Sequence, residues 1–398
     1  MQIGIGISKE KELLSALQDA LWQAKKEIGN KKLNIGFLFS SPEFASSNLL
    51  KTLCIYLPQT PIVGATTLGV LSRSQIHRHS LAICLISSDN LKISTAVVKD
   101  ISKKDAFLAG QDLGAKLLED FKGQKRDFVM LFCDGLLKEG SRLIHGLQEK
   151  LGTSFPIAGA SASDNLKFKQ TYIYYNDELL NDAAVGVLFG GKIVFNLSSR
   201  HGWRPLGKAR TVTQSEGNIL KEIDNQPAIN LYQDYFAKDI TLLKRDLKYI
   251  STLYPIGIYL EGEEEYLLRN IHSIEEDGSL VCQGDVPPKS TVRLMIGTKD
   301  SCLSASLQAT EELVKGFNIP TVIKKNMDIV LIFDSASRYA LLRRAAEEEL
   351  KIVQNTVSKD VPILGLYTYG EQAPLKALSY QGRSHFHNQS IVLTAVGD

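Results

Sequence analysis

Short apolar runs alternate with amphipathic stretches along the chain, and the alternation repeats. Three segments share one order: an apolar run, a stretch with helical periodicity, and a Pro-apolar-x-Gly sequence. The apolar runs lie at 33–41, 128–135 and 329–337, and the Pro-apolar-x-Gly sequences begin at Pro61, Pro156 and Pro362. A further apolar run follows each of them, at 80–87, 183–190 and 390–397. The pattern predicts one structural unit in about three copies.

The periodicity inside each unit predicts strands that are joined by helices. In the third copy Leu342, Ala345 and Val353 share one helix face, whereas Arg344 and Glu348 face away. Continuous apolar runs are typical of strands covered on both faces, and a strand–helix–strand connection favours a parallel pair. A helix also precedes each copy, and in the third copy the run 292–297 is expected to be the strand that introduces it. We therefore expect an α/β fold of mixed sheets covered by helices, with a repeated (β)α-β-α-β unit.

Other stretches predict antiparallel pairs and a division into two domains. Residues 188–196 are expected to form a hairpin around Gly190-Gly191-Lys192, and residues 254–298 to form strands around an Asp277-Gly278 turn. A chain of 398 residues is long for one core. We place a boundary near residue 225, between a predicted helix at 214–222 and another at 227–237. The predicted domains are therefore 1–225 and 226–398, packed tightly because no Pro/Gly/Ser-rich linker separates them.

The candidate site is expected where the three Pro-apolar-x-Gly sequences end. In open α/β sheets, ligands bind beyond the carboxyl ends of the strands. Glycine there allows the backbone to approach a ligand, and polar side chains follow it. The residues predicted to bind a small polar molecule are Gly64, Thr66, Thr67, Gly159, Ser161, Ser163, Asp164, Tyr367, Tyr369 and Glu371. The alternative is that each glycine merely ends its strand.

A second cluster lies in the segment 198–207. It places His201, Trp203 and Arg204 within four residues of one another, after an apolar strand. A large aromatic ring beside a guanidinium and an imidazole is typical of a binding surface, so Trp203 and Arg204 join the predicted ligand-binding set. The alternative is a packed corner in which Trp203 covers the edge of a sheet.

A third cluster precedes the last strand. His385 and His387 share one face of an extended segment, and Asn388 follows them. Two histidines without a close third ligand are a weak signal for metal. In the third unit Arg338 follows the strand and could hold a carboxylate with two parallel hydrogen bonds. Asn388 and Arg338 therefore also join the ligand-binding set.

Composition and charge exclude several classes of function. There are 46 basic and 44 acidic side chains, so the net charge of +2 gives no broad electrostatic surface for nucleic acid or for an anionic membrane. The five cysteines form no Cys-x-x-Cys pair, which fits a reducing compartment and disfavours a zinc site. No signal peptide or membrane-spanning run is expected, so the predicted location is the cytoplasm.

Taken together, these motifs resemble the FIST family. The resemblance rests on PIVGATTLG, PIAGASASD and SSRHGWRPLG, and on the C-terminal IVLIFDSASR, LGLYTYGE and HFHNQSIVLTA, and it covers the chain from about residue 33 to the end. It implies an N-terminal and a C-terminal FIST domain and a sensory role, with amino acids proposed as ligands. A subset of the family is similar to haem-binding nitric-oxide sensors that control a histidine kinase. The family often has Cys-x-x-Arg where this chain has Ser335-Ala336-Ser337-Arg338, so thiol chemistry is in doubt at that position.

Three functional hypotheses follow. The first is a sensor that binds a small amino-acid-like ligand and signals to a separate partner protein. The second is a haem-based nitric-oxide sensor that regulates a histidine kinase, with His201 as axial ligand and His387 as second choice. The third is a hydrolase with Ser161 or Ser163, His201 and Asp164. No Gly-x-Ser-x-Gly sequence is present, so no catalysis is expected. A homodimer is one open oligomeric state.

Overall fold

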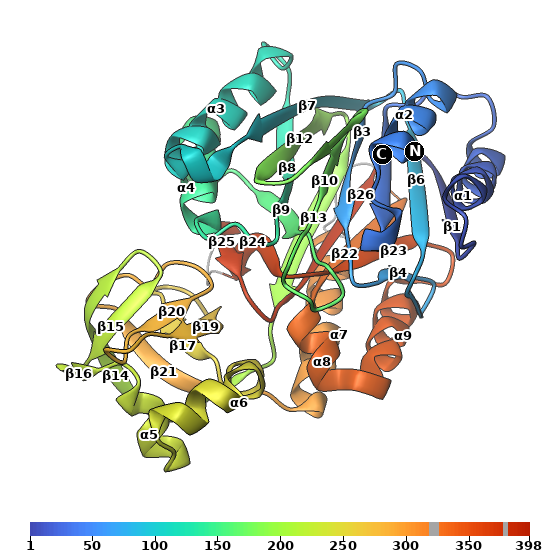
Figure 1. Ribbon diagram of the computed structural model, residues 1–398. Coiled ribbons are helices and arrows are strands. Elements are labelled where there is room, and N and C mark those ends of the chain that lie inside the picture. The colour runs from blue at the N-terminus through green and yellow to red at the C-terminus, as the bar shows by residue number, and fades with distance from the viewer. Residues whose placement is uncertain (318–325, 377–380) are drawn as a thin grey trace.

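The computed structural model describes residues 1–317, 326–376 and 381–398 (Figure 1). Its main body contains three units with one order of elements. The first unit consists of β1 (Gln2–Ser8), α1 (Leu13–Ile28), β2 (Ile35–Ser40), α2 (Ser47–Tyr56), β3 (Ile62–Thr66), β4 (Val70–Ser72), β5 (Gln75–His77) and β6 (Leu81–Ser87). None of the helices in the described ranges is long and apolar enough to cross a membrane.

The second and third units repeat this order. The second consists of β7 (Leu91–Lys99), α3 (Ala106–Glu119), β8 (Arg126–Cys133), α4 (Gly140–Leu151), β9 (Ile157–Ser161), β10 (Ile173–Tyr175), β11 (Glu178–Leu180) and β12 (Ala183–Gly191). The third consists of β13 (Val194–Arg200), α7 (Lys299–Phe317), β22 (Ile329–Ser335), α8 (Ala336–Leu342), α9 (Ala346–Val357), β23 (Ile363–Thr368), β24 (Gly370–Lys376), β25 (Gln381–His387) and β26 (Ile391–Gly397). The predicted mixed α/β fold with a threefold repeat is confirmed.

Each unit builds most of one sheet and completes another. The strand orders are β1-β6-β2-β3-β10-β11, β25-β24-β9-β8-β12-β7 and β13-β26-β22-β23-β4-β5. In each sheet the strand–helix–strand step is a parallel pair, as predicted: β2 with β3, β8 with β9, and β22 with β23. The final hairpin of each sheet comes from a different unit. The three units are therefore joined by backbone hydrogen bonds in a closed ring.

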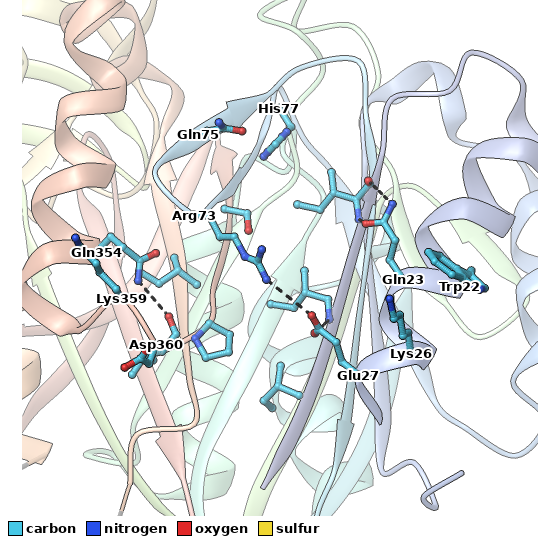
Figure 2. Close-up of a pocket in the computed structure, with 17 residues that line it drawn as sticks. Trp22, Gln23, Lys26, Glu27, Arg73, Gln75, His77, Gln354, Lys359 and Asp360 are labelled. Atoms are coloured by element: carbon cyan, nitrogen blue, oxygen red, sulfur yellow. Dashed lines mark hydrogen bonds and ion pairs between the residues drawn. The ribbon is translucent and has the colours of Figure 1, made fainter. Parts of the chain in front are cut away.

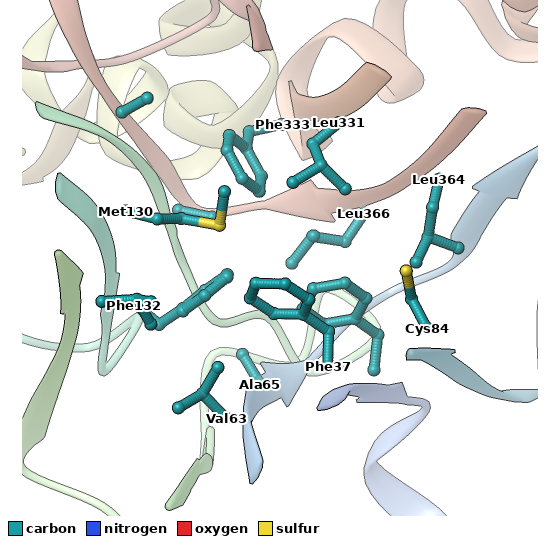
Figure 3. Close-up of a cluster of buried hydrophobic side chains, with 14 of the residues drawn as sticks. Phe37, Val63, Ala65, Cys84, Met130, Phe132, Leu331, Phe333, Leu364 and Leu366 are labelled. Carbon is teal, nitrogen blue, oxygen red and sulfur yellow. The ribbon is translucent and has the colours of Figure 1, made fainter. Parts of the chain in front are cut away.

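The inner faces of the three sheets meet in one hydrophobic core. Figure 3 shows Phe37 of β2, Phe132 of β8 and Phe333 of β22 packed among aliphatic side chains. The rings of Phe132 and Phe333 are 6.0 Å apart in an edge-to-face arrangement, which aromatic rings favour. Helices cover the outer faces, with α1 and α2 on the first sheet, α3 and α4 on the second, and α7 and α9 on the third.

The third unit contains an inserted lobe between β13 and α7, with its own core (Figure 1, lower left). The lobe consists of β14 (Arg204–Glu216), β15 (Ile219–Ile223), β16 (Gln226–Pro227), α5 (Asn230–Phe236), α6 (Ile240–Leu253), β17 (Ile256–Tyr259), β18 (Leu267–Arg269), β19 (Ile271–Ile274), β20 (Leu280–Cys282) and β21 (Thr291–Ile296). Helix α6 lies against α8 of the main body. The predicted turn at Asp277-Gly278 joins β19 to β20, and the helix expected at 227–237 is α5.

Three local predictions are wrong. The expected hairpin at 188–196 is absent, because β12 and β13 belong to different sheets. The helix expected at 214–222 is the end of β14 and most of β15, which are joined at Gly217 with a φ of 54°. The run 292–297 pairs with β14 and β17 in the lobe, and β13 takes the place expected for it. In each case the pairing of strands decided the outcome, and local periodicity does not reveal it.

The boundary near residue 225 stays a prediction. Within the described residues, three of the four sheets combine strands from both sides of that position.

The glycines of the Pro-apolar-x-Gly sequences lie inside strands and not in turns, which corrects the prediction. A Cβ added at Gly64 would lie 1.8 Å from the carbonyl oxygen of Leu38, its partner in the parallel pair. At Gly159 the same atom would lie 1.9 Å from the Leu131 oxygen, and at Gly365 it would lie 2.4 Å from the Ile332 oxygen. None of the three has a φ in the left-handed region. Each glycine is thus required by the approach of the neighbouring strand.

We expect Gly64→Ala to lower the free energy of unfolding by about 1–3 kcal/mol or more. The added methyl group overlaps backbone atoms that cannot move without disturbing the sheet. Urea unfolding monitored by circular dichroism measures the loss. Gly217→Asn is the matched control, since Gly217 has open space around it and Asn tolerates its positive φ. Equal stability of the two variants would contradict the steric requirement for glycine at position 64.

Candidate functional site

The bends that follow β3, β9 and β23 meet at the centre of the main body. The hydroxyls of Thr67 and Ser163 both donate to the carbonyl oxygen of Tyr367, at 2.9 and 2.6 Å. The backbone amide of Leu68 donates to the Ser163 hydroxyl at 2.8 Å, and that of Tyr369 donates to the Ser161 carbonyl at 3.1 Å. The sequence placed these three bends together, and the structure does the same.

The hydroxyls at the bends face protein groups and not a solvent cleft. Thr66 accepts from the amide of Tyr172 at 3.0 Å, and Ser161 accepts from the side-chain amide of Gln372 at 3.1 Å. Thr66, Thr67 and Ser163 are fully buried. These side chains join the three units, and a ligand would have to replace existing hydrogen bonds to reach them.

Asp164 lies in the second bend and forms a hydrogen bond with Tyr369 of the third bend. Its carboxylate accepts from the Tyr369 hydroxyl and from the backbone amides of Phe168, Lys169 and Gln170. Burial alone would raise the pKa of Asp164, but these hydrogen bonds stabilise the charged form and lower the pKa below its ordinary value. Asp164 therefore fixes the ring of Tyr369, which stacks on Phe168 with a centroid distance of 4.2 Å.

Arg338 lies in a buried charge cluster and is fully covered. Its guanidinium pairs with Glu349 of α9, lies 2.9 Å from Asp334 of β22, and donates to the carbonyl of His201 and to the hydroxyl of Ser306. Burial, followed by the neighbouring Glu349, raises the pKa of Asp334 well above its ordinary value. Arg338 thus binds protein acceptors, and the carboxylate clamp that the sequence suggested is occupied by side chains of this chain.

Glu371 and Asn388 also have partners within the protein. Glu371 receives a hydrogen bond from the Thr368 hydroxyl and another from the Ser390 amide at 3.1 Å. Burial raises its pKa to about 8, although these hydrogen bonds oppose the shift. Asn388 accepts from the backbone amide of Asn270 at 3.0 Å and so ties the lobe to the main body.

The cluster at 198–207 forms a packed corner. Trp203 is 3% exposed, packs against Leu268, Met295 and Cys302, and donates from its indole nitrogen to Leu253 at 3.2 Å. Arg204 is exposed on β14. The Nδ1 atom of His201 accepts from the Trp203 amide at 2.8 Å, and its Nε2 atom lies 3.8 Å from Glu265.

The surroundings of the two proposed axial histidines do not fit haem. His201 and His387 are 4% and 2% exposed. Neither side chain lines the cavity between the lobe and the main body or three other hollows formed by the described residues. Both nitrogens of His387 are engaged, with Ala373 and Ser390. Burial lowers the pKa of His387 to about 3, so its ring is neutral. In the described residues no group of three His, Cys, Asp or Glu side chains could hold a metal ion.

The hydrolytic triad considered in the third hypothesis does not assemble. The Ser163 hydroxyl donates to a carbonyl, Ser161 accepts from Gln372, and Asp164 holds Tyr369. His201 accepts from Trp203, and no hydrogen bond joins it to either serine in the described ranges.

A cavity of about 400 Å³ opens beside the third bend, between the lobe and the main body. It lies over the carboxyl ends of the parallel strands β22 and β23, the position at which α/β sheets bind ligands. The main body contributes Leu166, Phe168, Ala336, Ser337, Ala340, Thr368 and Tyr369. The lobe contributes Lys244, Arg245, Leu247, Lys248, Ser251, Thr252, Asn270, Ile271, His272 and Gln283. We call this cavity the α6 cleft.

Of the residues predicted from sequence as a site, Tyr369 lines the α6 cleft, and Asp164 and Asn388 hold residues that line it. The sequence analysis missed Lys244 and Lys248, although their spacing of four residues on a helix was a usable signal. It also missed Ser337 of α8, and it missed Asn270 and Gln283, because only the folded lobe brings these two residues to the third bend.

A larger groove of about 1060 Å³ lies elsewhere, between β1 and β5 (Figure 2). Its floor is formed by Ile3, Ile5 and Ile7, and Arg73 reaches across it to Glu27 at 3.8 Å. Gln23 and Glu27 bond the backbone amides of the β1 edge and so protect that edge from pairing with another strand. The groove lies at the amino end of β23, away from the bends, so we favour the α6 cleft as the functional site.

The buried carboxyl of Glu371 predicts a pH dependence of stability. Its folded pKa of about 8 exceeds the ordinary 4.5, so its contribution is complete below pH 4.5 and is lost as the pH rises through about 8. Glu371→Gln, which imitates the protonated side chain, should flatten this decline, worth on the order of a few kcal/mol. Urea unfolding of both proteins from pH 5 to pH 8.5 tests it. Parallel pH profiles for the two proteins would refute the assignment.

Comparison with known proteins gives a family and a distant likeness of fold. The family described as "FIST N domain" matches residues 34–226, and the family described as "FIST C domain" matches residues 228–374. An uncharacterized protein of Methanocaldococcus jannaschii is 23% identical over 261 residues, which cover 60% of this chain and 49% of that protein. This chain therefore spans about half the length of that relative.

Two solved structures of cyanuric acid hydrolases align along the chain. The first has 10% identity and a TM-score of 0.37, and covers 100% of this chain and 99% of its own. The second, from A. caulinodans, has 9% identity and a TM-score of 0.40, and covers 99% and 98%. No functional conclusion follows for this chain at such scores. The two family matches, which cover most of the sequence, show that this chain belongs to the FIST family of signal-transduction sensor domains.

Proposed function

We propose that this protein is a sensor that binds a small polar ligand in the α6 cleft and signals to a separate partner protein. The observation that carries the proposal is the cleft itself, which has polar and apolar walls and lies at the carboxyl ends of two parallel strands. It takes the place of the cleft between the three bends that the sequence suggested, because the hydroxyls at those bends are buried. On the family resemblance, the first candidate for the partner is a histidine kinase.

Binding in this cleft would act on the arrangement of the lobe relative to the main body. Gln283 of the lobe donates to the carbonyl of Tyr369, and Gln389 of the main body donates to the carbonyls of Ser251 and Thr252. These contacts form the floor between the two walls. A ligand that touches both walls stabilises one arrangement by its difference in affinity for the alternatives, which is the requirement for a sensor.

Filling the cleft should abolish ligand binding. We expect that at least one compound in a panel of amino acids and small carboxylates raises the melting temperature, since a ligand at 100 times its Kd stabilises by about 2.7 kcal/mol. Ala340→Trp places an indole in the cleft and should remove the response. Thermal-shift scans at several ligand concentrations measure both effects.

Ala209→Trp is the control, because Ala209 is exposed on β14 and does not line the cleft. It should respond like the unmodified protein. A flat response of the unmodified protein to the whole panel, or an equal response of Ala340→Trp, would refute the proposal.

A further inference from the structure

The lining of the α6 cleft is one-sided in charge. Lys244, Arg245 and Lys248 of α6 and His272 of β19 line it, and no Asp or Glu is among the described residues that do so. Arg245 is paired with Asp246, at 3.0 Å between Nε and Oδ1. Lys244 and Lys248 are exposed and one helical turn apart, so their ammonium groups lie on the same side of the cleft.

The carboxyl groups behind the cleft do not line it and are engaged by other groups of the protein. The Asp164 carboxylate is held by three backbone amides and by the Tyr369 hydroxyl. Glu371 accepts hydrogen bonds from Thr368 and Ser390, and Asp334 lies 2.9 Å from the Arg338 guanidinium, so both carboxyl groups face buried protein groups behind Thr368. The cleft therefore presents a positive rim without a matching negative wall.

Three backbone carbonyls at the floor already have donors. The carbonyl of Tyr369 accepts from Gln283, and the carbonyls of Ser251 and Thr252 accept from Gln389. The side-chain nitrogen of Asn270 is a less committed donor. It makes only long contacts of 3.5 Å, to Gln283 and to Ser337, whereas the oxygen of the same amide accepts from Gln389. A ligand that accepts hydrogen bonds suits this floor, whereas an ammonium group finds no carboxylate there and would lose its hydration without compensation.

We propose that the ligand of the α6 cleft is a small carboxylate without an ammonium group, such as a 2-oxo acid, and not an α-amino acid. Lys244 and Lys248 bind its carboxylate, and Asn270, Gln283 and Ser337 meet its polar end. Phe168, whose ring lies 5.6 Å from the Lys248 ammonium and stacks on Tyr369, covers its carbon skeleton. The inference rests on the proposed function, since it names the ligand class of the same site.

Matched pairs of compounds test the inference. Isothermal titration of the full chain compares 2-oxoglutarate with glutamate, pyruvate with alanine, and phenylpyruvate with phenylalanine, with inorganic phosphate as a further anion. We expect at least one oxo acid to bind about tenfold or more tightly than its amino acid. Lys244→Gln and Lys248→Gln should each weaken that binding about tenfold, as expected for a charge-assisted hydrogen bond.

Lys351→Gln, an exposed change on α9 outside the cleft, is the matched control and should bind as the unmodified protein does. The melting temperature of each variant verifies that it is folded. Amino acids that bind as tightly as their oxo acids would overturn the inference and leave the proposed function standing, and so would phosphate that binds as tightly as any carboxylate. No binding by any compound in the amino-acid and carboxylate panel would instead defeat the proposed function.

Discussion

The exchange of hairpins among the three sheets is the constraint on which the rest of the structure depends. Each unit contains a hairpin, just before its last strand, that pairs with the sheet of another unit, so no unit of the main body can complete its sheet alone. The exchange draws together the carboxyl ends of the three parallel pairs. Within each unit, Gly64, Gly159 and Gly365 let a strand lie close to its parallel neighbour.

Convergence has a cost for function. Where three polar bends meet in a small volume, their hydroxyls and carbonyls satisfy one another, as Thr67, Ser163 and Tyr367 do. Buried polar groups that are bonded in this way stabilise the centre and leave it closed to ligands. The place for a ligand therefore moves outward, to the flank of the third bend, where the inserted lobe leaves a cavity.

The sequence revealed what is local and what is repeated. The mixed α/β fold and its threefold repeat were predicted correctly, because each copy has the same local pattern, although the glycines of the Pro-apolar-x-Gly sequences lie in strands and not in the bends. The sequence did not reveal which sheet a strand joins. The segment 188–196 has a good turn sequence at Gly190-Gly191, yet the chain leaves one sheet there and enters another. The lobe was missed as an insertion for the same reason, and with it Lys244, Lys248 and Asn270.

Arg338 shows how a residue can be important without touching a ligand. It follows Ser337, which lines the α6 cleft, and its guanidinium donates to the carbonyl of His201, immediately after β13 and before the chain enters the lobe. The same side chain pairs with Glu349 of α9 and bonds Ser306 of α7. Removing one member of a buried ion pair leaves the charge of its partner uncompensated, so substitution of a single residue in this cluster is expected to destabilise the protein. The cleft wall and the entrance to the lobe are thus fixed to each other through one buried guanidinium. A ligand that shifts α8 must therefore act on the base of the lobe as well.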